Sequence, residues 1–116
     1  MEIKIVKDTI SKKELIDIAK EQFGDLVKAV IDVEQGIMAI GGEMHADDEV
    51  ILMEQADSKR EHTWGINLYP EKSGEELIEF DSIVNIKPSY GNRSRDVENP
   101  EIRTKIKDII NKLVIG

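Results

Sequence analysis

The sequence predicts one α+β domain over residues 1–116, in which a mainly antiparallel sheet of five or six strands carries an N-terminal and a C-terminal helix on one face. Three observations predict this fold class. The 116 residues are 40% hydrophobic, which is enough for one core without cross-links. Helical periodicity occurs near each end of the chain. The segments between the two helices alternate apolar and polar residues, and strands that no helix separates pair antiparallel.

The first two elements are a strand and a helix. Alternate isoleucines over residues 2–6 predict a short strand. Ser11 begins the helix with a capping box, because its hydroxyl can accept from the amide of Glu14, whose carboxylate can reach back. Gly24 is suited to end this helix. Its apolar stripe consists of Leu15, Ile18, Ala19, Gln22 and Phe23.

A β-hairpin is predicted next. Apolar and polar residues alternate over residues 27–33, and an apolar strand resumes over residues 37–40. Between them lies Gln35-Gly36, and its glycine tolerates the positive φ that a hairpin turn requires. Residues 49–53 are a further apolar run, which leaves the number of strands at five or six.

Two later segments complete the predicted sheet. Residues 64–69 alternate, and Pro70 ends this strand. Trp64, the only tryptophan, is expected in the core, where aromatic side chains are otherwise scarce. Residues 78–86 are predicted to form the last strand, and the charged stretch 54–62 is predicted to be a solvated loop.

The C-terminal helix is the clearest element of the sequence. Asn99 is a good N-cap, Pro100 suits the first helical position, and Glu101 complements the positive end of the helix dipole. The expected order of elements is therefore β-α-β-β-β-β-α. The buried stripe of the C-terminal helix consists of Ile102, Ile106, Ile109, Ile110 and Leu113.

Composition and motifs exclude several classes of protein. The chain has no cysteine, which excludes disulfides, thiolate nucleophiles, zinc fingers and iron–sulfur clusters. Its net charge of −8 disfavours nucleic acid as a partner. No apolar run approaches the roughly 18 residues of a membrane helix, and the first residues do not resemble a secretory signal, so a cytoplasmic protein is expected. Phosphate-binding loops, dinucleotide fingerprints and nucleophile elbows are also missing from the sequence.

The segment 41–49 is the first candidate site. If it is extended, Glu43, His45, Asp47 and Glu49 project to one side of the backbone, because side chains alternate along a strand. The first three would then bind a divalent metal such as zinc, manganese or iron, and Glu49 would act as the general base. The alternative is an ordinary loop between two strands, which we favour.

The second candidate site is the arginine pair of the long segment before the C-terminal helix. Arg93 and Arg95 present planar forks that hold phosphate or carboxylate through two bonds. Asn67 and Asp81 lie on the polar side of their strands, where they would line a shallow substrate pocket or meet water. In the alternative interpretation, which we favour, the arginines pair with surface carboxylates and fix the loop.

Four runs together resemble a known family. They are Gly-Gly-Glu-Met-His-Ala-Asp at 41–47, Trp-Gly-Ile-Asn-Leu-Tyr-Pro at 64–70, Ile-Glu-Phe-Asp-Ser at 78–82 and Asn-Arg-Ser-Arg at 92–95. The chain resembles a small prokaryotic family known only as a domain of unknown function, and the similarity extends from about the first helix to the last. The resemblance implies a stand-alone cytoplasmic protein and carries no activity, substrate or catalytic residue.

The sequence leaves two functional hypotheses. The first is a non-catalytic domain that binds a small, anionic ligand or a protein partner, with a homo-oligomer through an exposed strand edge or sheet face as one form of it. The second is a metal-dependent hydrolase or phosphoesterase, in which residues 43–47 hold a divalent cation and the two arginines clamp an anionic substrate. The first is favoured because no specific catalytic motif occurs.

Overall fold

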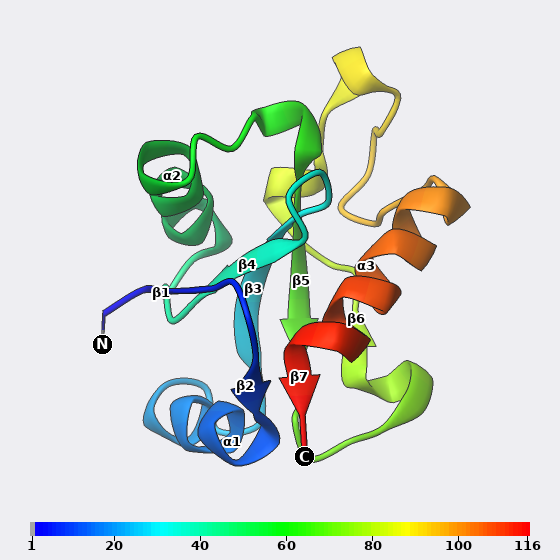
Figure 1. Ribbon diagram of the computed structural model, residues 1–116. Helices are drawn as coiled ribbons and strands as arrows, with labels where there is room; N and C mark the ends of the chain where they lie inside the picture. Colours follow the sequence, from blue (N-terminus) through cyan, green and yellow to red (C-terminus); the bar gives the residue numbers. More distant parts are fainter. Residues whose placement is uncertain (1) are drawn as a thin grey trace.

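A computed structural model describes residues 2–116 of the chain (Figure 1). The strands are β1 (Lys4–Val6), β2 (Ile10–Ser11), β3 (Val27–Asp32), β4 (Ile37–Ile40), β5 (Thr63–Leu68), β6 (Ile78–Glu79) and β7 (Val114–Ile115). The α-helices are α1 (Lys12–Glu21), α2 (His45–Gln55) and α3 (Pro100–Leu113). The 3₁₀ helices are η1 (Arg60–His62), η2 (Gly74–Leu77), η3 (Ile83–Asn85) and η4 (Pro88–Tyr90).

The main sheet has the strand order β1-β4-β3-β5-β6, and each neighbouring pair is antiparallel. The predicted hairpin is confirmed, since β3 and β4 pair in the register Asp32 with Ile37. Its turn contains Gly36 at φ +69°, a value that glycine adopts without steric cost. The prediction of a five-stranded antiparallel sheet is therefore confirmed.

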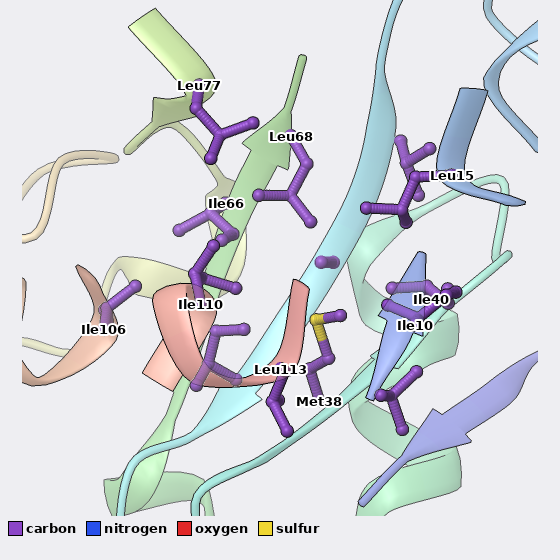
Figure 2. Packing of buried hydrophobic residues seen from close by; sticks show 14 of the residues in the cluster. Ile10, Leu15, Met38, Ile40, Ile66, Leu68, Leu77, Ile106, Ile110 and Leu113 are labelled. Atoms are coloured by element: carbon purple, nitrogen blue, oxygen red, sulfur yellow. The ribbon is translucent and has the colours of Figure 1, made fainter. Parts of the chain in front are cut away.

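One face of the sheet carries the larger core, and both predicted terminal helices cover it (Figure 2). Trp64 is 2% exposed and belongs to this core, as expected. Phe23 was expected in the α1 stripe but is 41% exposed, and its ring lies under the Lys28 ammonium at 4.7 Å. The helices contribute Leu15, Ile18, Ala19, Ile106, Ile110 and Leu113, and the sheet contributes Ala29, Ile31, Met38, Ile40, Ile66 and Leu68.

The other face of the sheet is covered by α2, which the sequence did not predict. Both interpretations of residues 41–49, the extended segment and the favoured loop between two strands, are wrong from His45 onward, because the helix begins there. The apolar run 49–53 belongs to the same helix. Its polarity is mixed: Asp48 and Glu49 are buried together with Leu52, whereas Val50 and Met53 are 47% and 42% exposed. Periodicity analysis assumes buried apolar residues, and this helix therefore lacks the pattern that predicts one.

The predicted last strand, 78–86, is also largely wrong. Only Ile78 and Glu79 pair with β5, and the chain then turns through η3. Asn85 replaces the missing strand, because its side-chain Oδ1 accepts from the Gly65 amide (2.7 Å) and its Nδ2 donates to the Gly65 carbonyl (2.9 Å). A single buried amide thus satisfies the backbone of β5 where no strand lies beside it.

A second, two-stranded sheet pairs the segment just before α1 with the segment just after α3. Strands β2 and β7 are parallel, with Ile10 opposite Val114 (Figure 1). Neither strand was predicted, because two residues are too few to show a period. The pair connects the start of α1 to the end of α3.

The N-cap of α1 is confirmed and gives a first testable prediction. Ser11 Oγ accepts a hydrogen bond from the Glu14 amide (3.1 Å), whereas the Glu14 carboxylate pairs with Lys4 Nζ (2.8 Å) instead of reaching back. We expect Ser11→Ala to lower the free energy of unfolding by about 1 kcal/mol, the usual cost of a lost cap. Chemical denaturation measures it. Ser11→Asp is the control and should retain wild-type stability, and a loss as large as that of Ser11→Ala would contradict a capping role.

Candidate functional site

Four of the residues selected from the sequence meet in one cavity of about 210 Å³ beside α2 and β5. We call it the His45 cavity. Its apolar wall includes Met44, Ile83 and Val84. Its polar lining consists of Lys28, His45, Asn67, Asp81, Ser82 and Arg95.

His45 lies in the first turn of α2, and its ring is directed at the sheet. Nε2 lies 2.8 Å from the Ile66 carbonyl oxygen. Because a carbonyl only accepts, Nε2 carries the proton of the neutral ring, which leaves Nδ1 as an acceptor. Burial lowers the pKa of His45 below its usual value, although the bond to Ile66 opposes that shift. The ring is therefore neutral at physiological pH.

Asn67 forms the polar base of the cavity and is 8% exposed. Its Nδ2 donates to Glu79 Oε1 (2.8 Å), which fixes the orientation of the amide, because a carboxylate only accepts. Its Oδ1 is buried and has no hydrogen-bond partner within residues 2–116. A buried unpaired acceptor costs about 1–3 kcal/mol, so this atom is the least satisfied polar group of the cavity.

Arg95 reaches the cavity from the loop before α3. Its Nε donates to Asp81 Oδ1 (2.6 Å), so the favoured pairing with a surface carboxylate is confirmed for Arg95, whereas no ion pair of Arg93 occurs within residues 2–116. Ordered contacts hold the loop: the Asn92 side chain donates to the Ser94 and Asp96 carbonyls, and the Glu98 carboxylate accepts from the Ser94 amide. Arg95 is thus presented by a structured loop and not by a flexible one.

The predicted metal ligands do not converge. Glu43 and Asp47 line a separate cavity of about 440 Å³ that His45 does not share. The cause is the helix: successive residues of α2 are about 100° apart, so alternate side chains do not share a side. Within residues 2–116, no group of three or more histidine, aspartate and glutamate side chains is placed to hold a metal ion.

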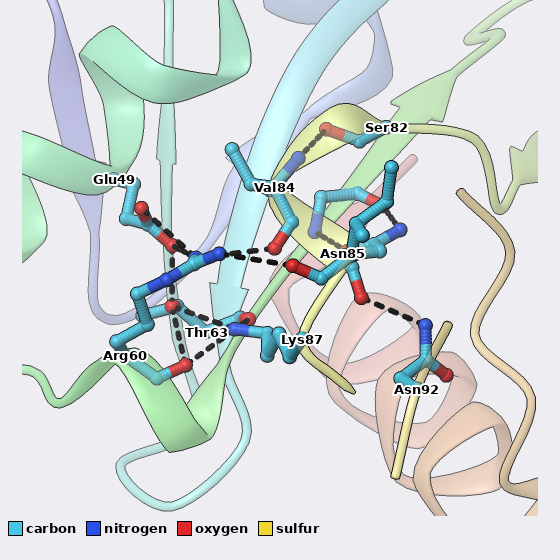
Figure 3. Close-up of polar contacts among 10 residues, drawn as sticks. Glu49, Arg60, Thr63, Ser82, Val84, Asn85, Lys87 and Asn92 are labelled. Atoms are coloured by element: carbon cyan, nitrogen blue, oxygen red, sulfur yellow. Dashed lines mark hydrogen bonds and ion pairs between the residues drawn. The ribbon is translucent and has the colours of Figure 1, made fainter. Parts of the chain in front are cut away.

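Glu49, the predicted general base, is engaged in a buried polar network (Figure 3). Its carboxylate accepts from Thr63 Oγ1 (2.7 Å) and from Arg60 Nη1 (3.0 Å). Arg60 also donates to the Val84 and Ile86 carbonyls (3.1 and 3.2 Å). The network joins α2 to β5 and η3, and Glu49 does not line the His45 cavity. Arg60 belongs to the stretch 54–62 that was predicted to be solvated.

Lys87 completes this network and was not selected from the sequence. It is 3% exposed, and its ammonium donates to the Arg60 and Thr63 carbonyls while lying 4.7 Å from the centroid of the Trp64 ring. Burial, together with the nearby Arg60 charge, lowers the pKa of Lys87 to about 8. These contacts assign Lys87 a structural role.

Sequence reasoning missed Lys28 and Ser82 among the polar residues of the cavity, and it selected Arg93 as well as Glu43, Asp47 and Glu49, which lie outside. Lys28 lines the cavity from β3, and its place on the polar side of an alternating strand was the signal that could have identified it. Arg93 does not line the cavity, although its backbone amide donates to Glu98 Oε2 (3.0 Å). Of the two arginines, therefore, only Arg95 lines the His45 cavity.

Two findings bear on classification. Among residues 2–116, none of the helices combines the length and the apolar character that crossing a membrane requires. Comparison with curated proteins gives no match, and comparison with solved structures gives none either. The model of one family matches residues 4–113, nearly the whole chain, which agrees with the resemblance found in the sequence. The chain belongs to the family described as "Protein of unknown function (DUF5674)".

Proposed function

We propose that the protein binds a small anionic molecule in the His45 cavity, reversibly and without transforming it. The observation that carries the proposal is the presence of two cationic side chains, Lys28 and Arg95, in one cavity with a buried acceptor that lacks a partner. They reach it from β3 and from the loop before α3. Ligand sites characteristically combine apolar walls with a few polar groups, and this cavity has both.

The charge of the cavity supports an anion. Its lining holds two cations and one carboxylate, and that carboxylate, Asp81, is already paired with Arg95 Nε. The terminal nitrogens of Arg95 have no hydrogen-bond partner within residues 2–116 and remain available as a planar donor fork. The net charge of −8 makes a local cationic site unusual for this protein. A negatively charged ligand is therefore attracted here and repelled from most of the surface.

The absence of an assembled catalytic group favours binding over reaction. Glu49 is held by Arg60 and Thr63 outside the cavity. The Nε2–H group of His45 is engaged in a hydrogen bond to the Ile66 carbonyl. Within residues 2–116, His45 forms no hydrogen bond with a hydroxyl group, and the Thr63 hydroxyl that donates to Glu49 is buried outside the cavity. Covalent catalysis requires an accessible nucleophile activated by a base.

A thermal-shift experiment tests the proposal. Lactate, propionate and inorganic phosphate, each at saturating concentration, are added to the purified protein. Binding to the native state alone raises the melting temperature, by an amount equivalent to about 2.7 kcal/mol when the ligand is present at 100 times its Kd. We expect at least one of these anions to raise it.

The two arginines provide a matched control. Arg95→Ala should abolish the shift, because it removes a cavity cation, and Arg93→Ala should retain it, because that side chain lies outside. The proposal fails if no anion shifts the melting temperature. It also fails if Arg95→Ala and Arg93→Ala behave alike.

A further inference from the structure

We infer that the ligand of the His45 cavity is a monocarboxylate that carries a hydroxyl group on the carbon next to the carboxylate. The inference rests on the proposed function and adds a substrate class to it. Its basis is the juxtaposition of two cationic donors with two unpaired acceptors, which are His45 Nδ1 and Asn67 Oδ1. An anion alone satisfies the cations and leaves both acceptors unpaired.

The first acceptor is fixed by the backbone of β5. His45 Nε2 is committed to the Ile66 carbonyl at 2.8 Å, so rotation of the ring to offer a donor to the ligand would break that bond. Nδ1 of a neutral ring presents a lone pair, and it has no hydrogen-bond partner within residues 2–116. The groups that complement it are O–H and N–H, and a second carboxylate does not.

The second acceptor is fixed by a carboxylate. Glu79 Oε1 holds the Asn67 Nδ2 at 2.8 Å, and Tyr69 also donates to this oxygen (3.2 Å). The amide cannot be reversed without placing two acceptors against each other, so Oδ1 remains the atom of Asn67 that is left to accept a hydrogen bond.

The cations determine the rest of the ligand. Lys28 and Arg95 together exceed the single carboxylate, Asp81, by one positive charge, which matches one negative charge on the ligand. The guanidinium fork of Arg95 suits the two oxygens of a carboxylate. A cavity of about 210 Å³ lies below the usual volume of pockets for drug-sized ligands, which limits the ligand to a few heavy atoms.

A matched set of small molecules tests the inference by NMR titration of the isotopically labelled protein. Propionate supplies the charge alone, lactamide supplies the hydroxyl without the charge, and lactate supplies both groups. We expect lactate to bind about five- to tenfold more tightly than propionate, the factor that one net hydrogen bond provides. Lactamide should not bind measurably.

The two histidines provide the matched control. His45→Phe keeps an aromatic ring and removes the acceptor, so it should reduce the affinity for lactate to that for propionate. His62→Phe should not, because His62 does not line this cavity. The amide spectrum reports in the same experiment whether each variant is folded. If His45→Phe is unfolded, Asn67→Leu removes the second acceptor and should reduce the same preference.

The outcomes separate the inference from the proposed function. Equal affinities for propionate and lactate would overturn the inference and leave an anion site in place. A preference that persists in folded His45→Phe or Asn67→Leu would also overturn it. Lactamide binding as tightly as lactate, or no binding by any carboxylate, would overturn the proposed function itself.

Discussion

Gly65→Ala is expected to lower the free energy of unfolding by about 3–4 kcal/mol, because β5 has no space for a methyl group at this position. A Cβ atom there would lie 2.5 Å from Ser82 Oγ and 2.8 Å from Val84 Cγ2, well inside van der Waals contact. The segment 82–85 would have to move away. That movement would break the two buried hydrogen bonds between the Gly65 backbone and the Asn85 side chain.

The same substitution should weaken ligand binding, since Ser82 and Val84 line the His45 cavity. Asn85 also donates to the Arg95 carbonyl (2.9 Å), so displacement of Asn85 is expected to move the arginine loop. Urea denaturation measures the stability, and titration with lactate measures the binding.

Gly36→Asn serves as the control for Gly65→Ala. Gly36 also lies next to a strand, at φ +69°, but a Cβ there has no heavy atom within 4 Å, and asparagine tolerates this backbone conformation. It should cost less than about 1 kcal/mol. Similar losses in the two variants would refute steric exclusion at Gly65.

Asp48→Asn is expected to stabilise the protein at pH 9 by on the order of 3 kcal/mol and to have little effect at pH 4. The wild-type carboxyl is fully buried in α2. Its Oδ1 accepts from the Gly42 amide (2.9 Å), and its Oδ2 has no hydrogen-bond partner within residues 2–116. Burial raises the pKa of Asp48 to about 8, against 3.8 for the exposed group. Asparagine retains the oxygen that accepts from Gly42 and carries no charge.

The direction of the pH effect follows from proton binding. Between pH 3.8 and about 8 the native state holds a proton on Asp48 that the unfolded state has released, so the free energy of unfolding falls as the pH rises. The effect is complete above the folded pKa. Lys87 acts in the opposite direction at higher pH: its pKa of about 8 lies below the exposed value of 10.5, so the unfolded state holds the extra proton and stability rises over that range.

Denaturation at several pH values from 4 to 9 measures the difference between wild-type protein and Asp48→Asn. Asp47→Asn is the control, because Asp47 is exposed one residue earlier in the same helix. The Asp47 charge raises the pKa of Asp48 less than burial does, so we expect the stability of Asp47→Asn to fall with pH almost as steeply as that of the wild type. If the difference between Asp48→Asn and the wild type did not change with pH, Asp48 would be ionised in the native state, contrary to its burial.

The sequence by itself determined the elements whose signals are local. Ser11 and Asn99 cap the two terminal helices as predicted, since a cap needs only the amides of the next few residues. The stripes of α1 and α3 follow the helical period and lie over one face of the sheet. The turn at Gly36 similarly fixed the hairpin. Together these features were sufficient for the α+β class and for the antiparallel pairing.

The candidate site was predictable only in part. His45, Asn67, Asp81 and Arg95 were selected from the sequence as polar residues with suitable chemistry, and the structure brings them together in one cavity. His45 was grouped with Glu43 and Asp47 on the assumption that the segment is extended, with alternate side chains on one side. That assumption fails because of the helix at residues 45–55, which separates these side chains.

Only the tertiary structure decided where the polar groups of α2 lie. Asp48 can be buried because its carboxyl group accepts a hydrogen bond from the Gly42 amide. Glu49 can be buried because its carboxylate accepts hydrogen bonds from Thr63 and Arg60, which lie 14 and 11 residues away in sequence. Pattern analysis treats such residues as solvent-facing, because an isolated carboxylate is costly to bury. The cost falls when distant parts of the chain supply hydrogen bonds, and these partners exist only once the chain has folded.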